Sequence, residues 1–230
     1  MTRSLFKNKY LSLPYITWHV VFILTLSVIA GFLYAKGYLY NPTTATHETI
    51  NSTYNVTSND DIMNQDGTKI ARGSNQMWIG TNKNISRSYL GIRFTGKKMP
   101  SGAKITAAEI TFVSDKMQSI PISTTTYIEN NTLASAFSSK NTPSQRRLLR
   151  SKKIRKDNVT WEENKSYSYD VTDLVKDAYK ANGINGSIVF IIKGTFNSEA
   201  KKTFYGSPST LKSPRLRIQY KLPENKISKK

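Results

Sequence analysis

The densest group of chemically capable side chains is a basic run between residues 146 and 156, which reads Arg-Arg-Leu-Leu-Arg-Ser-Lys-Lys-Ile-Arg-Lys. Guanidinium groups bind phosphate and carboxylate through paired hydrogen bonds, and clustered lysines attract polyanions. An exposed loop in a lysine-rich protein is the alternative interpretation, and a processing site for a basic-specific protease is a third. The run predicts a polyanion-binding site made by Arg146, Arg147, Arg150, Lys152, Lys153, Arg155 and Lys156.

A second group of candidates lies on predicted β-strands, where alternation indicates which side chains face solvent. In segments 77–79 and 89–94, apolar residues alternate with Trp78, Tyr89 and Arg93. Because successive side chains of a strand point to opposite faces, these three are expected to point away from the core. Trp78, Tyr89 and Arg93 are therefore candidates for contacting sugar rings, with ordinary covering of a second sheet as the alternative.

Residue types that usually carry catalysis are scarce. The chain has no cysteine, and its two histidines, His19 and His47, precede the predicted folded body. The usual nucleophile–base triads and zinc sites need these residues. Carboxylate pairs remain, but Asp170 and Asp173 flank a predicted helix start, where capping accounts for them. The Asn/Asp-rich segment 59–67 does not fit the EF-hand pattern. We predict a protein that is not an enzyme and holds no metal or cofactor.

An uncharged stretch near the N-terminus predicts a membrane anchor. No charged residue occurs between Leu11 and Ala35, and about 20 apolar residues suffice to cross a bilayer. Three basic residues precede this stretch and one follows it, which favours a cytoplasmic N-terminus. We predict a cytoplasmic basic segment over 1–13 and a single span over 14–35. A cleaved signal peptide is the alternative, and either interpretation exports the rest of the chain.

The charge balance indicates anionic partners. The chain has 34 Lys+Arg against 15 Asp+Glu, a formal net charge of +19. Such an excess attracts polyanions over a long range. Outside the cell, polysaccharide, anionic wall polymer and acidic lipid are more accessible than nucleic acid, which we do not expect as a partner. Self-association into a homo-oligomer stays open.

The exported part divides into three predicted segments: a Thr/Asn-rich stalk over 36–59, a folded body over 60–222 and a basic tail over 223–230. The body has many short strand patterns separated by Gly, Pro and Asn, which is typical of a β-sandwich. The apolar run 187–192 does not alternate, so both of its faces should be covered. The predicted strands are 76–80, 89–94, 104–113, 121–129, 158–163, 166–170, 187–192, 202–206 and 215–221.

One amphipathic helix interrupts the strands. Its apolar residues follow helical spacing from Val171 to Tyr179, Thr172 is the predicted N-cap, and Gly183 supplies the stop. The expected fold is therefore all-β, a jelly-roll β-sandwich with one short crossover helix, behind a single N-terminal transmembrane helix.

Several motifs follow one another in an order that resembles the DNRLRE-type domain family. They are Leu90–Phe94, Met99–Ile110, Tyr169–Val175, Asn185–Val189, Phe204–Ser207 and Ser213–Tyr220. The resemblance covers about 60–222 and implies a jelly-roll sandwich that acts as an extracellular, often carbohydrate-binding or adhesive, module. The chain departs from the family's usual pattern by having Ala178-Tyr179 where a Trp is usual, and Ser209 where an acidic residue is usual.

Together these features predict a membrane-anchored extracytoplasmic binding or adhesion protein that recognises carbohydrate or an anionic cell-surface polymer. A structural subunit of a surface filament or envelope layer is the main alternative. A membrane-bound enzyme acting on polysaccharide is the least favoured, because no catalytic set is visible.

Overall fold

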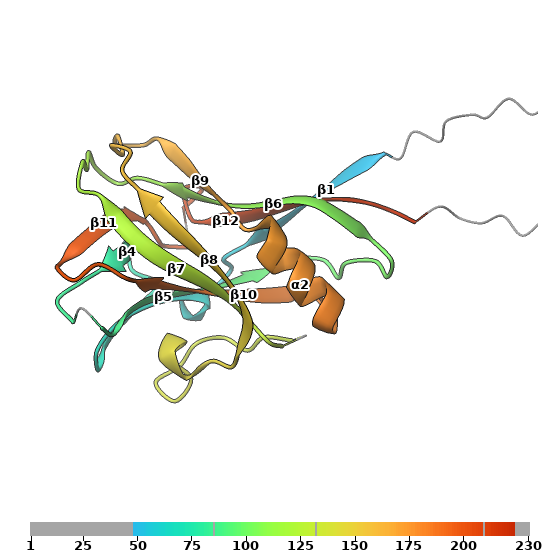
Figure 1. The fold of residues 1–230 in the computed structure, drawn as a ribbon, viewed down its shortest axis with the longest axis horizontal. Helices are drawn as coiled ribbons and strands as arrows, with labels where there is room; N and C mark the ends of the chain where they lie inside the picture. Colours follow the sequence, from blue (N-terminus) through green and yellow to red (C-terminus); the bar gives the residue numbers. More distant parts are fainter. Residues whose placement is uncertain (1–47, 85, 132, 209, 224–230) are drawn as a thin grey trace, which may run out of the picture. The chain divides into compact units, whose positions relative to one another are not determined.

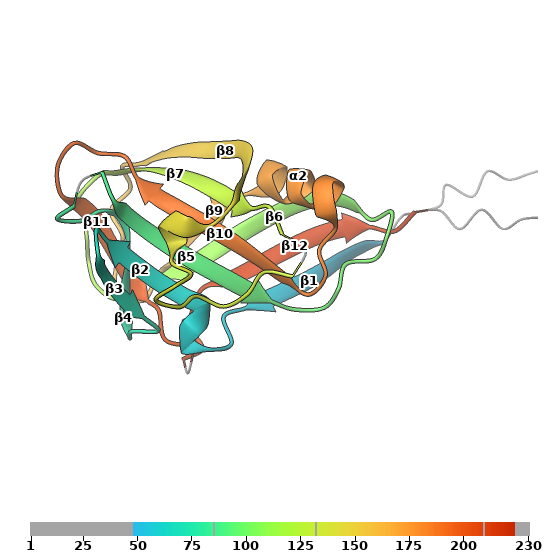
Figure 2. The same cartoon turned by 90° about the horizontal axis from the view of Figure 1, so that it is seen from below.

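A computed structural model describes residues 48–223, apart from residues 85, 132 and 209. The described chain is mostly β: an antiparallel sheet curls into a half-barrel and one short α-helix packs against it (Figure 1, Figure 2). The predicted segment 1–13, the span 14–35, the first half of the predicted stalk (36–47) and the tail beyond Pro223 lie outside the described residues. Between residues 48 and 223, the described helices are too short or too polar to cross a membrane.

The curled sheet has eight strands in a row, and every strand pairing is antiparallel. Their order is β8 (Leu148–Asp157), β7 (Ile122–Glu129), β10 (Ser187–Gly194), β5 (Ser88–Thr95), β1 (Thr49–Asn55), β12 (Arg215–Lys221), β6 (Lys104–Val113) and β9 (Ser166–Asp170). The two halves of this row meet at a single residue pair, Asn55 of β1 with Thr95 of β5. The sheet can therefore bend at that junction.

Smaller elements complete the fold. Strand β2 (Ile62–Asp66) pairs with β5 and with β3 (Lys69–Arg72), and β4 (Gln76–Thr81) pairs with β11 (Ala200–Tyr205) in a separate two-stranded sheet. Two short 3₁₀ turns are η1 (Asn59–Asp61) and η2 (Pro143–Gln145).

The core lies inside the curl, where the alternating apolar residues meet. Aromatic rings pack edge to face across it: Phe94 lies 6.1 Å from Phe190 and Phe112 lies 4.9 Å from Phe204, measured between ring centroids. The alternation that predicted strands 89–94, 104–113 and 215–221 is thus confirmed, because the apolar member of each pair is buried. The fully buried positions include Leu90, Phe94, Phe190, Leu216 and Ile218.

Helix α2 (Thr172–Asn182) is confirmed, with one correction at its start. Its N-cap is Val171, whereas Thr172 is the first helical residue and donates its hydroxyl and its backbone N–H to Asp170 Oδ1. Leu174 and Val175 are buried against the sheet. Gly183 ends the helix as predicted, because its φ of +69° suits glycine and its N–H donates to the Tyr179 carbonyl.

The body begins earlier than the sequence indicated. Strand β1 occupies Thr49–Asn55, inside the predicted stalk, and all seven of its residues are in register with β12. Tyr54 is 1% exposed and donates its hydroxyl to the Lys97 carbonyl at 2.7 Å. The predicted stalk is therefore wrong over this stretch, because Ser, Thr and Asn here form a strand through pairing rather than through apolar content.

One other local prediction is wrong: the predicted strand 158–163 is instead a connection in which only Trp161 bridges to Gln118. The basic run forms most of strand β8, so the alternative interpretation of the run as an exposed loop does not hold. The short strands β2 and β3 were not predicted.

Strand β10 is buried on both faces, as its unbroken apolar run predicted. Its outer face carries Val189 and Ile191, which pack in a second, smaller cluster under segment 130–147. Phe137 of that segment lies so close to β5 that a Cβ on Gly91 would come within 2.4 Å of its ring. Glycine at position 91 is therefore required for the segment to lie against the sheet.

Candidate polymer-binding face

The basic run lies on β8, at one edge of the curled sheet, and strand alternation divides it into two sets. One set is exposed on the outer face and the other points toward the inside of the curl, because the side-chain period of a strand is two residues. The outer set is Leu148, Arg150, Lys152, Ile154 and Lys156. The inner set is Leu149, Ser151, Lys153, Arg155 and Asp157.

Strand register brings the outer cations beside tyrosines from neighbouring strands. Lys152 is opposite Tyr127 on β7, and Lys193 on β10 is opposite Tyr89 on β5. The Lys193 Nζ lies 5.7 Å from the centroid of the Tyr89 ring. Because neighbouring strands lie about 4.8 Å apart, the surface from β5 to β8 is roughly 15 Å wide. We define the outer basic face as Tyr89, Tyr127, Arg150, Lys152, Lys156 and Lys193.

Both tyrosines of the outer basic face are held in place. Tyr89 and Tyr127 are half-buried and pack against the second hydrophobic cluster, so each side chain is supported by the cluster and partly exposed to solvent. A supported, half-exposed aromatic side chain loses little conformational freedom when a sugar packs against it, and the surrounding lysines add charge without strong orientation. The arrangement suits a polymer with both ring surfaces and anionic groups.

The inner set of β8 closes the gap between the two edges of the sheet. Lys153 Nζ lies 2.5 Å from Asp170 Oδ2, and Arg155 donates to the Ser168 carbonyl at 3.3 Å and lies 3.9 Å from the Tyr169 ring centroid. Asp170 and Ser168 belong to β9, at the opposite end of the strand order. Lys153 and Arg155, predicted as polymer contacts, therefore hold the curl together.

The contacts of Asp170 affect its ionisation. Hydrogen bonds from Lys153 and Thr172 lower the pKa of the Asp170 carboxyl to about 2. Asp170 accordingly stays charged and bound at the helix start, which agrees with the capping interpretation of this residue.

Arg146 is also a structural residue rather than a polymer contact. Its side chain is 2% exposed, and Nη1 lies 2.9 Å from Glu129 Oε2. Its Nη2 donates to the Ser135 and Ala136 carbonyls, and its guanidinium lies 4.4 Å from the Phe137 ring centroid. The prediction that Arg146 contacts a polymer is wrong, because its buried side chain fastens segment 130–147 to β7. Arg147 is exposed just before β8 and stays a candidate.

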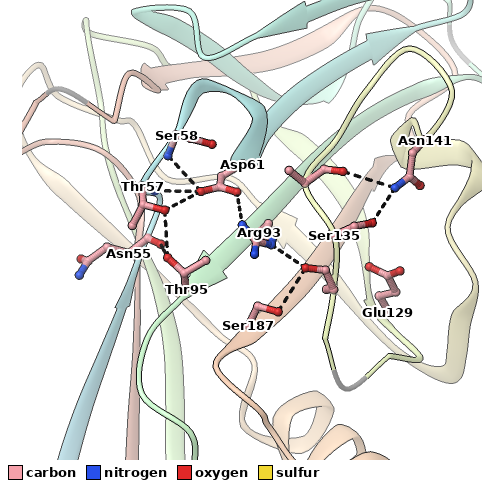
Figure 3. Close-up of polar contacts among 12 residues, drawn as sticks. Asn55, Thr57, Ser58, Asp61, Arg93, Thr95, Glu129, Ser135, Asn141 and Ser187 are labelled. Atoms are coloured by element: carbon pink, nitrogen blue, oxygen red, sulfur yellow. Dashed lines mark hydrogen bonds and ion pairs between the residues drawn. The ribbon is translucent and has the colours of Figure 1, made fainter.

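Arg93, a predicted sugar contact, is occupied by structural contacts. Its Nη1 donates to Asp61 Oδ1 at 2.6 Å and its Nε donates to the Ala134 carbonyl at 2.6 Å (Figure 3). Asp61 is fully buried and accepts further hydrogen bonds from the backbone N–H groups of Thr57 and Ser58. Arg93 thus joins turn η1 to segment 130–147, and these contacts argue against its predicted role as a sugar contact.

Trp78 and Tyr89 belong to different sheets, although their backbone carbonyls both accept hydrogen bonds from Asn64 Nδ2, at 2.8 and 3.4 Å. Trp78 is half-buried on β4 of the two-stranded sheet, where its backbone N–H and carbonyl both bond to the Asn64 side chain. Tyr89 lies on the outer basic face. Tyr127 and Lys193 were not among the sequence candidates, although Tyr127 lies within the predicted strand 121–129 and Lys193 directly follows the apolar run 187–192.

Carboxylates do not form an obvious chemical centre. Within residues 48–223, the described His, Asp and Glu side chains form no group of three or more that could hold a metal ion. Glu109 and Asp170 are opposite each other in register and line a 160 Å³ pocket together with Arg217. The comparisons with known proteins add no assignment: no protein-family model matches the chain, and no curated protein matches it.

Proposed function

We propose that this chain is a membrane-anchored, extracytoplasmic binding protein whose β-domain holds an anionic cell-surface polymer on the outer basic face. The observation that carries the proposal is the register, which puts Lys152 beside Tyr127 and Lys193 beside Tyr89 on one surface. Carboxylate or phosphate groups of the polymer pair with the lysines, and its sugar rings stack on the tyrosines. The uncharged stretch before Lys36 supports the anchor and the export.

We also propose that the curled antiparallel sheet is, more specifically, a jelly-roll β-sandwich. The strand order supports it, since β8–β7–β10–β5 and β1–β12–β6–β9 form two halves that meet at one residue pair. The motif order that resembles the DNRLRE-type domain supports it too, together with the adhesive or carbohydrate-binding role that the resemblance implies.

The alternative, a filament or envelope subunit, is supported by the edge position of β8, where a strand of another copy could pair. Inward-pointing charges on an edge strand oppose such pairing, and β8 has two, Lys153 and Arg155. Polymer binding is therefore the better-supported function.

The experiment uses a fragment from His47 to the C-terminus. This fragment is suited to isolation because the curled sheet, the helix and both hydrophobic clusters lie entirely within it. One variant replaces the outer cations (Arg150→Gln, Lys152→Gln, Lys156→Gln and Lys193→Gln). A matched control removes four exposed lysines elsewhere (Lys97→Gln, Lys98→Gln, Lys104→Gln and Lys180→Gln).

Binding to polygalacturonate and to lipoteichoic acid is measured by calorimetry at low and at physiological salt. Exposed ion pairs contribute about 0.2–1 kcal/mol each, so the outer variant should bind roughly thirtyfold more weakly. Its affinity should also depend less on salt than that of the parent. Equal losses of affinity in the two variants would show that only net charge matters. That result would refute the assignment of the outer basic face as the binding site. A Tyr89→Ala, Tyr127→Ala variant should weaken binding at every salt concentration.

A further inference from the structure

Lys202 has the most unusual environment of the described lysines. It lies on β11 with a side chain that is 0% exposed, and its Nζ is 3.1 Å from Oδ1 of Asp157, whose side chain is 2% exposed. Its Nζ also donates to the Val159 carbonyl. Lysine is almost never fully buried unless it is paired. Neither Lys202 nor Asp157 belongs to the outer basic face.

Aromatic rings surround the pair. The Trp161 ring centroid is 5.4 Å from Lys202 Nζ, and Trp161 and Tyr169 are both buried and pack edge to face. Burial lowers the pKa of the Lys202 ammonium, because desolvation disfavours its charged form. A buried lysine that releases its proton becomes a nucleophilic amine.

The two oxygens of Asp157 have different partners. Oδ1 faces Lys202 Nζ, whereas Oδ2 accepts hydrogen bonds from Trp161 Nε1 at 3.1 Å and from the Tyr169 hydroxyl at 3.2 Å. The Arg155 guanidinium adds a positive charge 3.9 Å from Oδ2. Burial raises the pKa of the Tyr169 hydroxyl, so it stays protonated and remains a donor. Donors fixed around one oxygen stabilise the negative charge that develops there when a nucleophile attacks the carbonyl carbon.

We propose that Lys202 and Asp157 condense to an intramolecular isopeptide bond. A proton first passes from Nζ to Oδ1, which leaves a neutral amine beside a neutral carboxylic acid. Nζ then attacks Cγ, and the negative charge of the tetrahedral intermediate resides on Oδ2 among its donors. A second proton passes from Nζ to Oδ1, the Cγ–Oδ1 bond breaks, and Oδ1 leaves as water. An ammonium and a carboxylate thus become an amide and one water, with no oxidant, reductant or cofactor.

Two physical effects favour this condensation. The reacting groups are held in contact by the fold, which replaces an encounter in solution. The product also removes two charges from a buried aromatic site, where charge is costly. The bond would join the end of β8 to β11 and close a long loop, as a disulfide does in other exported proteins, in a chain that has no cysteine.

The test is the intact mass of the full-length chain, purified in detergent and denatured. The expected mass is lower than the sequence mass by one water, after allowance for the initiator methionine. Trypsin should release segment 157–165 joined to segment 202–212 as one branched peptide. Lys202→Met and Asp157→Ala should restore the full mass, and Asp157→Asn should lose ammonia in place of water.

The adjacent Lys201 provides a matched control, because its Nζ bonds to Glu199 and Asn82 near the surface. Lys201→Met should keep the loss of one water. A parent chain with the full sequence mass and two separate tryptic peptides would overturn the proposal and leave Lys202 and Asp157 as an ion pair. The mass is read on denatured protein, so this outcome is decisive whether or not a variant folds, and it does not depend on polymer binding.

Discussion

Arg146 and Arg147 are neighbours in the sequence, but the structure assigns them different environments. Replacing each by glutamine therefore gives a matched pair of variants that lose the same charge. Arg147 is exposed, whereas the Arg146 guanidinium makes hydrogen bonds to Glu129 and to the Ser135 and Ala136 carbonyls. Only the loss of Arg146 should reduce the free energy of unfolding substantially.

The expected magnitude follows from the charge that is left behind. The Glu129 side chain is 9% exposed, so without Arg146 its carboxylate would stay buried with no cation to balance it. Removing one partner of a buried ion pair costs about 3–5 kcal/mol, and two backbone carbonyls lose a donor as well. Arg147→Gln should change the free energy of unfolding by no more than about 0.5 kcal/mol.

The assay is urea unfolding of the fragment that begins at His47, followed by the fluorescence of buried Trp161. A double variant, Glu129→Gln with Arg146→Gln, should recover part of the loss because it removes the unbalanced carboxylate. If the free energies of unfolding of the Arg146→Gln and Arg147→Gln variants differ by less than about 1 kcal/mol, Arg146 does not fasten segment 130–147 as described.

Three further results are expected. A fragment that begins at residue 58 lacks β1 and the buried Tyr54, so its free energy of unfolding should fall by at least about 3 kcal/mol relative to the longer fragment, and equal urea midpoints would contradict the strand's role. The pKa of Asp170 is about 2, below its unfolded value, so Asp170 stabilises the fold above about pH 4 and this contribution is lost as the pH falls toward 2. Lys153→Gln should return that pKa toward its ordinary value in an NMR titration, and an unchanged midpoint would exclude Lys153 as the cause. Leu174→Ala should cost about 2–5 kcal/mol in thermal unfolding, whereas an unchanged melting temperature would show that the helix does not pack on the sheet.

The sequence alone was enough to predict the elements whose stability depends on a local repeating pattern. Alternation located β5, β6 and β12, helical spacing located α2, and the unbroken apolar run of β10 predicted burial on both faces. Gly183 was recognisable as the helix stop because few other residues tolerate a positive φ. These features depend on residues a few positions apart, so the pattern is visible in the chain itself.

The tertiary structure decided the elements and the site residues that depend on distant partners. Strand β1 consists mostly of small polar residues and forms because β12, more than 160 residues later, offers a matching edge. Strand alternation divides the basic run into outer and inner sets, and the inner cations Lys153 and Arg155 are occupied because β9 lies across the gap and supplies Asp170 and Ser168 as partners. Charge density is a property of neighbouring residues, but its accessibility depends on what packs against each side chain. The sequence therefore indicated a basic site, and the fold decided which of its cations are free to bind.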